Sequence, residues 1–341
     1  DSIAYVRGRS LWVTDRAGRA RELVGDNEET VAWGSAEFIA AEEMRRQRGF
    51  WWSPDGSMLA VCRVDTAPVD VWYIADPATP NREPVPARYP AAGTSNADVS
   101  LHVVRVADGA SVAVDWDRER FPYLVQVDWS SHGLAVTVQS RDQRELKVYV
   151  VDVDTGETTS VWSDTDDAWV EIVVGTGRLV APGTAVMCTD RDGARRLVIG
   201  DDAVSPADVQ VRSVLHASAE RIVVNGNPID DPTVLHVYEW TPAGWSALTT
   251  GTGVNTAVAD DTNTVLRSAV LDEPGGRWRL PSGHVLASNA ERPLVRPNVR
   301  LSPPTADRPT TAVLLPHDHD GSPLPVLLDP YGGPHAQRVV H

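Results

Sequence analysis

The feature that most constrains this sequence is a β-type pattern that repeats in units along most of the chain. Runs of alternating character, such as Met58–Cys62 and Lys147–Val151, are separated by turns that contain Asp-Gly or Thr-Gly. A period of two predicts β-strands, and these turn residues supply the backbone conformation that tight hairpins need. The strands group into units of roughly 40 to 60 residues, the size of a β-propeller blade.

The first unit is partial and ends near Val24. The others are expected at Phe50–Trp116, Tyr123–Trp162, Trp169–Val204, Val211–Leu248 and, more weakly, Asn255–Ser288. Radial repetition of sheets protects their edges, which is why such units occur in arrays, whereas a β-sandwich would not repeat in this way. The sequence therefore predicts an all-β fold, an incomplete β-propeller of about five to six blades.

The composition excludes several classes of partner. The chain has 31 Lys and Arg against 47 Asp and Glu, a net charge of −16. An acidic chain lacks the positive surface that nucleic acid or an anionic membrane requires, so no nucleic acid partner is expected. The charge serves either to solvate the surface or to attract cationic substrate termini. No run of 18 apolar residues occurs, so no membrane span is expected.

The few residues of metal-binding or redox type do not form a recognisable site. Cys62 and Cys188 lie in separate apolar runs without a Cys-x-x-Cys motif, which favours buried free thiols over a disulfide. His317 and His319 flank an aspartate, but no further ligands accompany them, and a polar turn is the better interpretation. We expect no metal and no cofactor.

One segment, Ala36–Gly49, has a helical pattern inside the β region. It is rich in Ala, Glu, Met, Arg and Gln, and Gly49 is a natural helix stop. Its adjacent carboxylates, Glu42 and Glu43, can together grip a peptide α-ammonium, which offers three donors and one charge. In the alternative, they form only helical surface pairs worth about 0.2–0.5 kcal/mol each. The candidates for those pairs are Arg45, Arg46 and Gln47.

The pattern changes after Glu291. A proline-rich, linker-like stretch is followed by two runs that are apolar at every position, 310–315 and 325–328. Such runs are typical of strands buried on both faces of an α/β sheet, so we expect the first strands of a second domain here.

Tyr331 follows the second of these runs, where α/β folds place their active sites. Its hydroxyl can donate to an oxyanion, and Gly332 and Gly333 would allow close backbone approach. In the alternative, the tyrosine is packed at a domain junction. No Gly-x-Ser-x-Gly sequence occurs in the chain, so a nucleophile elbow is absent from it.

Several stretches together resemble the dipeptidyl peptidase IV group of the prolyl oligopeptidase clan, serine peptidase family S9, and most of all its bacterial members. The combination of Glu-Glu and Trp-Trp is the specific feature, whereas Ser-Pro-Asp-Gly is common to many propellers. The stretches are Ala36–Met44, Gly49–Gly56, Arg88–Asn96, Gln139–Gln143 and Leu327–Pro334.

The resemblance implies a propeller of an eight-bladed type over residues 1–290, with the helical insertion 36–49, and the truncated start of an α/β-hydrolase peptidase domain over residues 291–341. Glu42 and Glu43 would bind the free amino terminus of the substrate, and Tyr331 would be the oxyanion donor. The catalytic Ser, Asp and His would lie beyond His341, and an arginine that contacts the substrate would precede Asp1.

The implied activity is that of a serine-type exopeptidase that releases N-terminal dipeptides with Pro or Ala second. The expected partners are peptides with a free N-terminus, and the full-length protein is expected to be a homodimer, as relatives often are. The chain starts with Asp rather than Met, so the true N-terminus is taken to be missing. A bacterial cytoplasmic location is expected, with secretion left open.

Two other functions stay open at this point. One is another peptidase of the clan, such as an acylaminoacyl peptidase, although those enzymes lack the Glu-Glu helix. The other is a non-catalytic propeller that binds peptide or protein.

Overall fold

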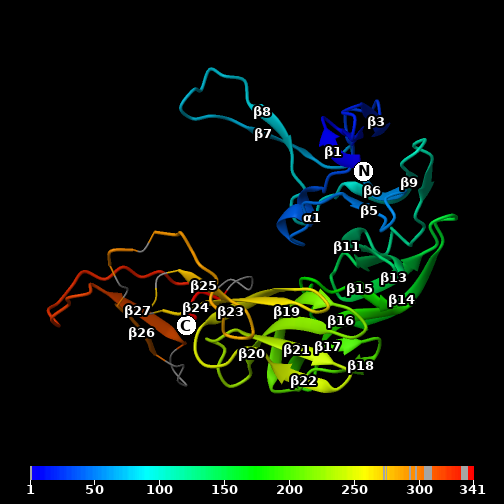
Figure 1. The fold of residues 1–341 in the computed structure, drawn as a ribbon. Helices are drawn as coiled ribbons and strands as arrows, with labels where there is room; N and C mark the ends of the chain where they lie inside the picture. The colour runs from blue at the N-terminus through cyan, green and yellow to red at the C-terminus, as the bar shows by residue number, and fades with distance from the viewer. Residues whose placement is uncertain are drawn as a thin grey trace. The chain divides into compact units, whose positions relative to one another are not determined.

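The computed structural model describes residues 2–271, 273, 275–291, 293–295, 298–302, 309–331 and 337–341. The regular secondary structure of these residues consists of β-strands, most of them paired antiparallel, and α1 (Phe38–Glu42) is the only helix among them (Figure 1). The chain divides into two compact units. The first comprises the chain up to Ile172 together with Gly177–Val186, and the second comprises Val173–Thr176 together with the chain from Met187 onward.

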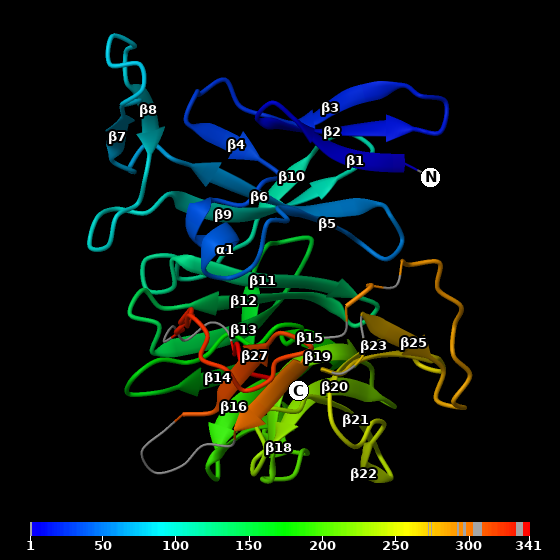
Figure 2. The same ribbon diagram turned by 90° about the vertical axis from the view of Figure 1, so that its left-hand side faces the viewer.

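Three sheets and a hairpin follow one another in the first half of the chain. The first sheet has the order β1 (Ser2–Arg7), β2 (Ser10–Asp15), β3 (Ala20–Val24). The second has the order β10 (Ser111–Ala113), β9 (Asp98–Arg105), β6 (Met58–Asp65), β4 (Val31–Trp33), and β5 (Phe50–Trp52) also pairs with β6. The third has the order β11 (Tyr123–Ser130), β12 (Gly133–Gln139), β13 (Glu145–Val151), β14 (Thr158–Thr165). The hairpin of β7 (Val71–Ile74) and β8 (Val85–Arg88) projects away from these sheets (Figure 2).

Three further sheets and a two-stranded ribbon complete the described structure. The fourth sheet has the order β15 (Arg178–Ala181), β16 (Thr184–Arg191), β17 (Ala194–Ile199), β18 (Asp202–Ala203). The fifth has the order β19 (Val209–Ala217), β20 (Ile222–Pro228), β21 (His236–Thr241), β22 (Gly244–Ala247). The sixth has the order β23 (Val254–Ala259), β24 (Thr264–Ala269), β25 (Gly276–Arg279), and β26 (Asn298–Ser302) pairs with β27 (Thr311–Leu315).

This architecture confirms the predicted repeat. Each of the six units expected from the sequence contains most of one sheet, although β4 precedes the second unit and that unit also contains the β7–β8 hairpin. The strands of most sheets follow one another in chain order, as they do in a propeller blade. The described part of the chain contains no helix that is long and apolar enough to cross a bilayer. Cys62 and Cys188 are buried and free, as expected.

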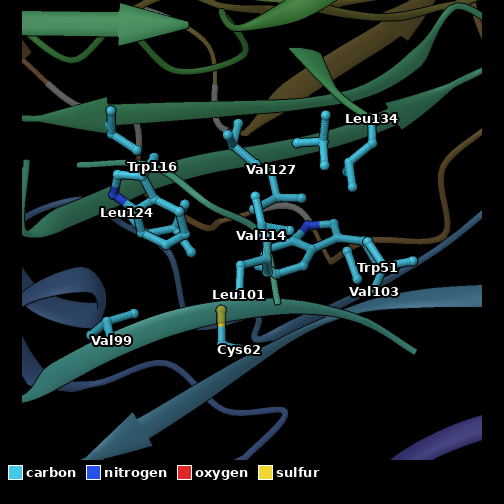
Figure 3. Close-up of a cluster of buried hydrophobic side chains, with 14 of the residues drawn as sticks. Trp51, Cys62, Val99, Leu101, Val103, Val114, Trp116, Leu124, Val127 and Leu134 are labelled. Carbon is cyan, nitrogen blue, oxygen red and sulfur yellow. The ribbon is translucent and has the colours of Figure 1, made fainter. Parts of the chain in front are cut away.

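The second sheet shows how neighbouring sheets pack, because its strand β6 is buried on both faces. Leu59 and Val61 point into a cluster shared with β2, β3 and β4. Ala60 and Cys62, which alternate with them, point into a cluster shared with β9, β11 and β12 (Figure 3). Successive side chains of a strand point to opposite faces, so one strand contributes to two hydrophobic cores.

The C-terminal expectations are only partly met. The run 310–315 forms β27, but this strand is largely exposed, so the prediction that it is buried on both faces is wrong. Residues 325–328 form no strand, and Val326, Leu327 and Leu328 are exposed, so the prediction of a buried strand there is also wrong. A strand requires a hydrogen-bonded neighbour, and no described strand pairs with this run.

Two separate glycines, Gly156 and Gly183, allow a comparison of tight and open packing at positions of positive φ. Gly156 has φ +80°, and a Cβ added to it would lie 2.0 Å from the Ala113 carbonyl oxygen. Gly183 has φ +71°, but its nearest neighbour would be 3.9 Å away. Alanine at either position costs on the order of 1 kcal/mol in backbone strain. We expect Gly156→Ala to lose about 1–3 kcal/mol more because of the clash. Urea unfolding should show this difference, and equal losses would contradict it.

Candidate functional site

The segment that contains α1 connects β4 to β5, and both of these strands pair with β6 of the second sheet. β4 pairs with residues 63–65 of β6, and β5 pairs with residues 59–61. Cys62 lies between these two stretches and bonds to both ends of the segment: its N–H donates to the Gly49 carbonyl at 2.8 Å, and its carbonyl accepts from the Gly34 N–H at 2.9 Å. Residues 34–49 therefore form an insertion with a closed base.

The base is closed tightly because two glycines meet there. A Cβ on Gly49 would lie 2.4 Å from the Ser35 nitrogen and 2.5 Å from the Gly34 carbonyl carbon. Only a residue without a side chain permits this approach, so Gly49 is required for packing. A bridge between Ser35 and Arg48 continues the closure.

The helix α1 begins at a charged cap. The Glu37 carboxylate accepts hydrogen bonds from the Ile39 N–H at 2.5 Å and the Ala40 N–H at 2.8 Å, which satisfies two of the free donors of the first turn. Ala40 is fully buried and clusters with Met44 and Val125. This contact fixes one face of the helix on β11.

The helix ends after five residues, so the prediction of a helix over 36–49 is wrong in its extent. The Glu43 N–H donates to the Ile39 carbonyl, but Arg45 has φ +54°, and the Arg46 N–H turns back to the Ala40 carbonyl at 2.9 Å. A left-handed residue ends a helix and reverses the chain. Composition indicated a longer helix because Arg and Gln are good helix formers, and the tertiary contacts of Arg46 override that preference.

Glu42 and Glu43 lie at the end of this helix, and both are exposed. Among the described residues, no hydrogen bond or ion pair engages either carboxylate. Arg46, one candidate partner on the helix surface, is turned into the protein instead. The two carboxylates therefore offer their acceptor capacity to a ligand, and a cation with several N–H donors is the complementary group.

Arg46 is buried, with 7% of its surface exposed. Its Nε and Nη2 donate to the Leu124 carbonyl at 3.2 and 3.0 Å, and Nη1 donates to the Arg48 carbonyl at 2.9 Å. Its guanidinium lies 5.9 Å from the centre of the Trp51 ring, within cation–π range. Nη1 is also 3.7 Å from Cys62 Sγ.

Burial changes the acidity of two groups near Arg46. Desolvation raises the pKa of Glu37 above its usual range, although its two backbone hydrogen bonds and the Arg46 charge oppose the change. Burial also raises the pKa of the Cys62 thiol, again against the effect of Arg46. Cys62 is therefore an inert core thiol rather than a nucleophile.

Tyr331 lies in the second unit, in irregular structure rather than after a buried strand. Its ring is exposed and lies 5.2 Å from the Arg338 guanidinium, whose Nη1 is 3.6 Å from the Asp329 carboxylate. Gly332, Gly333 and His335 lie outside the described residues. Among the described residues, no group of three or more His, Cys, Asp or Glu is placed to hold a metal ion.

Sequence reasoning missed Glu37 and Arg46, which hold the insertion. Glu is not among the preferred N-cap residues, and Arg46 stands in a polar run that reads as surface. The one indication in the sequence was Met44, an apolar residue inside that polar run. It suggests that part of the run faces the protein interior, and Met44 is indeed buried.

Comparisons with known proteins agree with the fold. The family model of the dipeptidyl peptidase IV N-terminal region matches residues 1–241. A probable dipeptidyl peptidase 4 of Neosartorya fischeri is 25% identical over 391 aligned positions, covering 99% of this chain and 50% of that protein. A probable dipeptidyl-aminopeptidase B of Emericella nidulans is 28% identical over 195 positions, covering 50% of this chain and 21% of its own length.

Two solved structures share the fold. A putative dipeptidyl aminopeptidase IV of Bacteroides ovatus superposes with a TM-score of 0.81 at 18% identity over 99% of this chain and 53% of that one. Dipeptidyl peptidase 4 of Porphyromonas gingivalis gives 0.73 at 17% identity over 92% of this chain and 48% of that one. The chain thus spans about half the length of the first of these curated relatives and about half of each of these structures.

The raised pKa of Glu37 predicts a pH-dependent contribution to stability. A carboxyl whose pKa is raised on folding binds a proton more readily in the folded state, so its contribution is full below the ordinary pKa of 4.5 and is lost as pH rises through the folded value. We expect the Tm of the chain, relative to that of Glu37→Gln, to fall as pH rises above 4.5. Parallel Tm profiles for the two proteins would contradict it.

Proposed function

Because the chain belongs to the family of the dipeptidyl peptidase IV N-terminal region, matched over residues 1–241, we propose that it is the substrate-gating propeller of a serine-type dipeptidyl aminopeptidase. The whole protein releases dipeptides from the free N-terminus of peptides, with Pro or Ala at the second position. Its Ser, Asp and His lie on residues outside this chain, since no nucleophile elbow is present in it.

The observation that carries the proposal is the exposed pair Glu42 and Glu43, with which no described residue forms a hydrogen bond or ion pair, on an insertion whose two ends are held by the side chains of Glu37 and Arg46. A peptide α-ammonium supplies three donors and a positive charge, and two neighbouring carboxylates can receive it without first breaking an ion pair. Binding the amine at a fixed place sets the distance to the reacting peptide bond, so remote binding energy orients the reaction.

Tyr331 has a separate role in the proposed mechanism. Residues 291–341 form the start of the hydrolase domain, and the Tyr331 hydroxyl donates a hydrogen bond to the oxyanion that forms on the substrate carbonyl. Its ring is exposed, which leaves the hydroxyl available to a substrate. A donor of this kind stabilises the charged transition state more than the neutral carbonyl.

Neutralising the glutamate pair tests the amine site. In the full-length protein, Glu42→Gln or Glu43→Gln should lower kcat/KM for a free-amine Gly-Pro substrate, because a charged partner is lost. The fall should correspond to a loss of about 2–5 kcal/mol in transition-state binding free energy. The slow cleavage of an N-acetylated analogue should not change. Glu29→Gln, an exposed glutamate outside the insertion, is the control. A wild-type enzyme that cleaves both substrates equally well has no amine site.

Removing the Tyr331 hydroxyl tests the oxyanion donor. Tyr331→Phe keeps the ring and its contact with Arg338, so folding should be retained. We expect kcat of the full-length protein to fall by roughly 10²–10³, as for the loss of other oxyanion donors. Steady-state kinetics with thermal unfolding as control measure this. A Phe variant with wild-type kcat means that the tyrosine only packs.

A further inference from the structure

We propose that Arg46 and Glu37 are positioning residues that hold Glu42 and Glu43 in place for the substrate amine. This inference rests on the proposed function of the glutamate pair and adds two residues to it. Neither side chain is exposed to a ligand in the way the glutamates are. They act through the backbone of the insertion that carries the pair.

The need for such residues follows from the size of α1. Helices shorter than about 12 residues are marginal on their own in water, and α1 has five. Its apolar anchor is small, since Ala40 and Met44 are its buried contacts with Val125. Two adjacent carboxylates at its end repel each other and favour fraying. Something other than helix propensity must therefore fix Glu42 and Glu43.

Arg46 supplies the first lock, at the C-terminal side of the pair. It bonds to the carbonyl of Leu124 through two nitrogens, at a place where the pairing of β11 with β12 shifts register between Leu124 and Gln126. A bulge disrupts the ladder locally, which leaves backbone groups for a side chain to bind. The third bond, to the Arg48 carbonyl, ties the lock to the returning end of the insertion.

Glu37 supplies the second lock, at the N-terminal side. It holds the first turn of α1 through the N–H groups of Ile39 and Ala40. The Ala40 carbonyl, in turn, accepts a hydrogen bond from the Arg46 N–H, so Ala40 is bonded to both Glu37 and Arg46. The Arg46 charge also opposes the rise in the pKa of Glu37 that burial causes. Both side chains therefore act on the backbone of the insertion from below the exposed pair.

The shape of the guanidinium makes the role specific to arginine. Its planar fork directs three N–H groups to two carbonyls while its face lies over Trp51. A lysine ammonium is a compact point charge and cannot reproduce this geometry. We therefore expect Arg46→Lys to keep the charge and lose most of the positioning.

The test compares Arg46→Lys, Arg46→Met and Glu37→Gln in the full-length protein. Arg48→Met is the matched control, because the Arg48 side chain also lies 5.8 Å from the Trp51 ring but is exposed and donates to the nearby Phe50 carbonyl, and the substitution keeps the Arg48 backbone carbonyl that Arg46 binds. Displacing a binding group by about 1 Å can cost about 10²-fold. We expect both Arg46 variants to lose about 10- to 100-fold in kcat/KM for a free-amine Gly-Pro substrate, chiefly through KM. The rate with the N-acetylated analogue and the Arg48→Met control should be unchanged.

A double-mutant cycle separates positioning from simple loss of structure. In a Glu42→Gln, Glu43→Gln background, Arg46→Lys should no longer change kcat/KM for the free-amine substrate, because the groups that it positions have lost their charge. If Arg46→Lys lowers kcat/KM equally for the free-amine and the N-acetylated substrate, the residue supports the fold and the proposal is overturned. The same follows if Arg46→Lys still lowers kcat/KM for the free-amine substrate in that background.

The remaining outcomes are also decisive. If Arg46→Met does not fold, Arg46→Lys and Glu37→Gln carry the test. The glutamate variants are expected to lower kcat/KM for the free-amine substrate only. If they do so while folded Arg46 and Glu37 variants have wild-type kcat/KM, the positioning proposal alone fails. If the glutamate variants themselves do not affect the preference for a free amine, the proposed function fails and this inference fails with it.

Discussion

The structure depends on the burial of both faces of its inner sheets. In β6 the side chains alternate between two hydrophobic cores, with Leu59 and Val61 on one side and Ala60 and Cys62 on the other. A sheet buried in this way has no face left for a ligand, so exposed binding groups are expected on turns and insertions. The position of Glu42 and Glu43 on an insertion at the edge of β6 follows from that constraint.

The same strand connects the core to the candidate site. Cys62 contributes its side chain to a hydrophobic cluster and its backbone to the closed base of the insertion. Trp51 belongs to that cluster and also lies under the Arg46 guanidinium. Packing of the second and third sheets therefore fixes the base of the site as well as the fold. A scaffold of this kind holds a binding group more accurately than a free loop does.

The sequence predicts those parts of the structure that local patterns determine. Alternation and Asp-Gly turns place the six sheets, since period and turn geometry are properties of short segments. The length of α1 and the roles of Glu37 and Arg46 depend on contacts with Leu124, which is distant in the sequence, so local propensity predicts them incorrectly. The run 325–328 shows the same limit, because a buried strand requires a partner that a local pattern cannot identify.

The division between buried and exposed charge explains how the site can be ready for its ligand. If Arg46 paired with Glu42 or Glu43, the substrate ammonium would have to displace it, and part of the binding free energy would be lost. Instead, the arginine donates to backbone carbonyls, and its guanidinium lies over the Trp51 ring. The carboxylates of Glu42 and Glu43 are exposed, and no described residue forms a hydrogen bond or an ion pair with them. In the proposed function, the two glutamates are ordered when the chain folds, so a peptide amine would not have to supply that ordering free energy on binding.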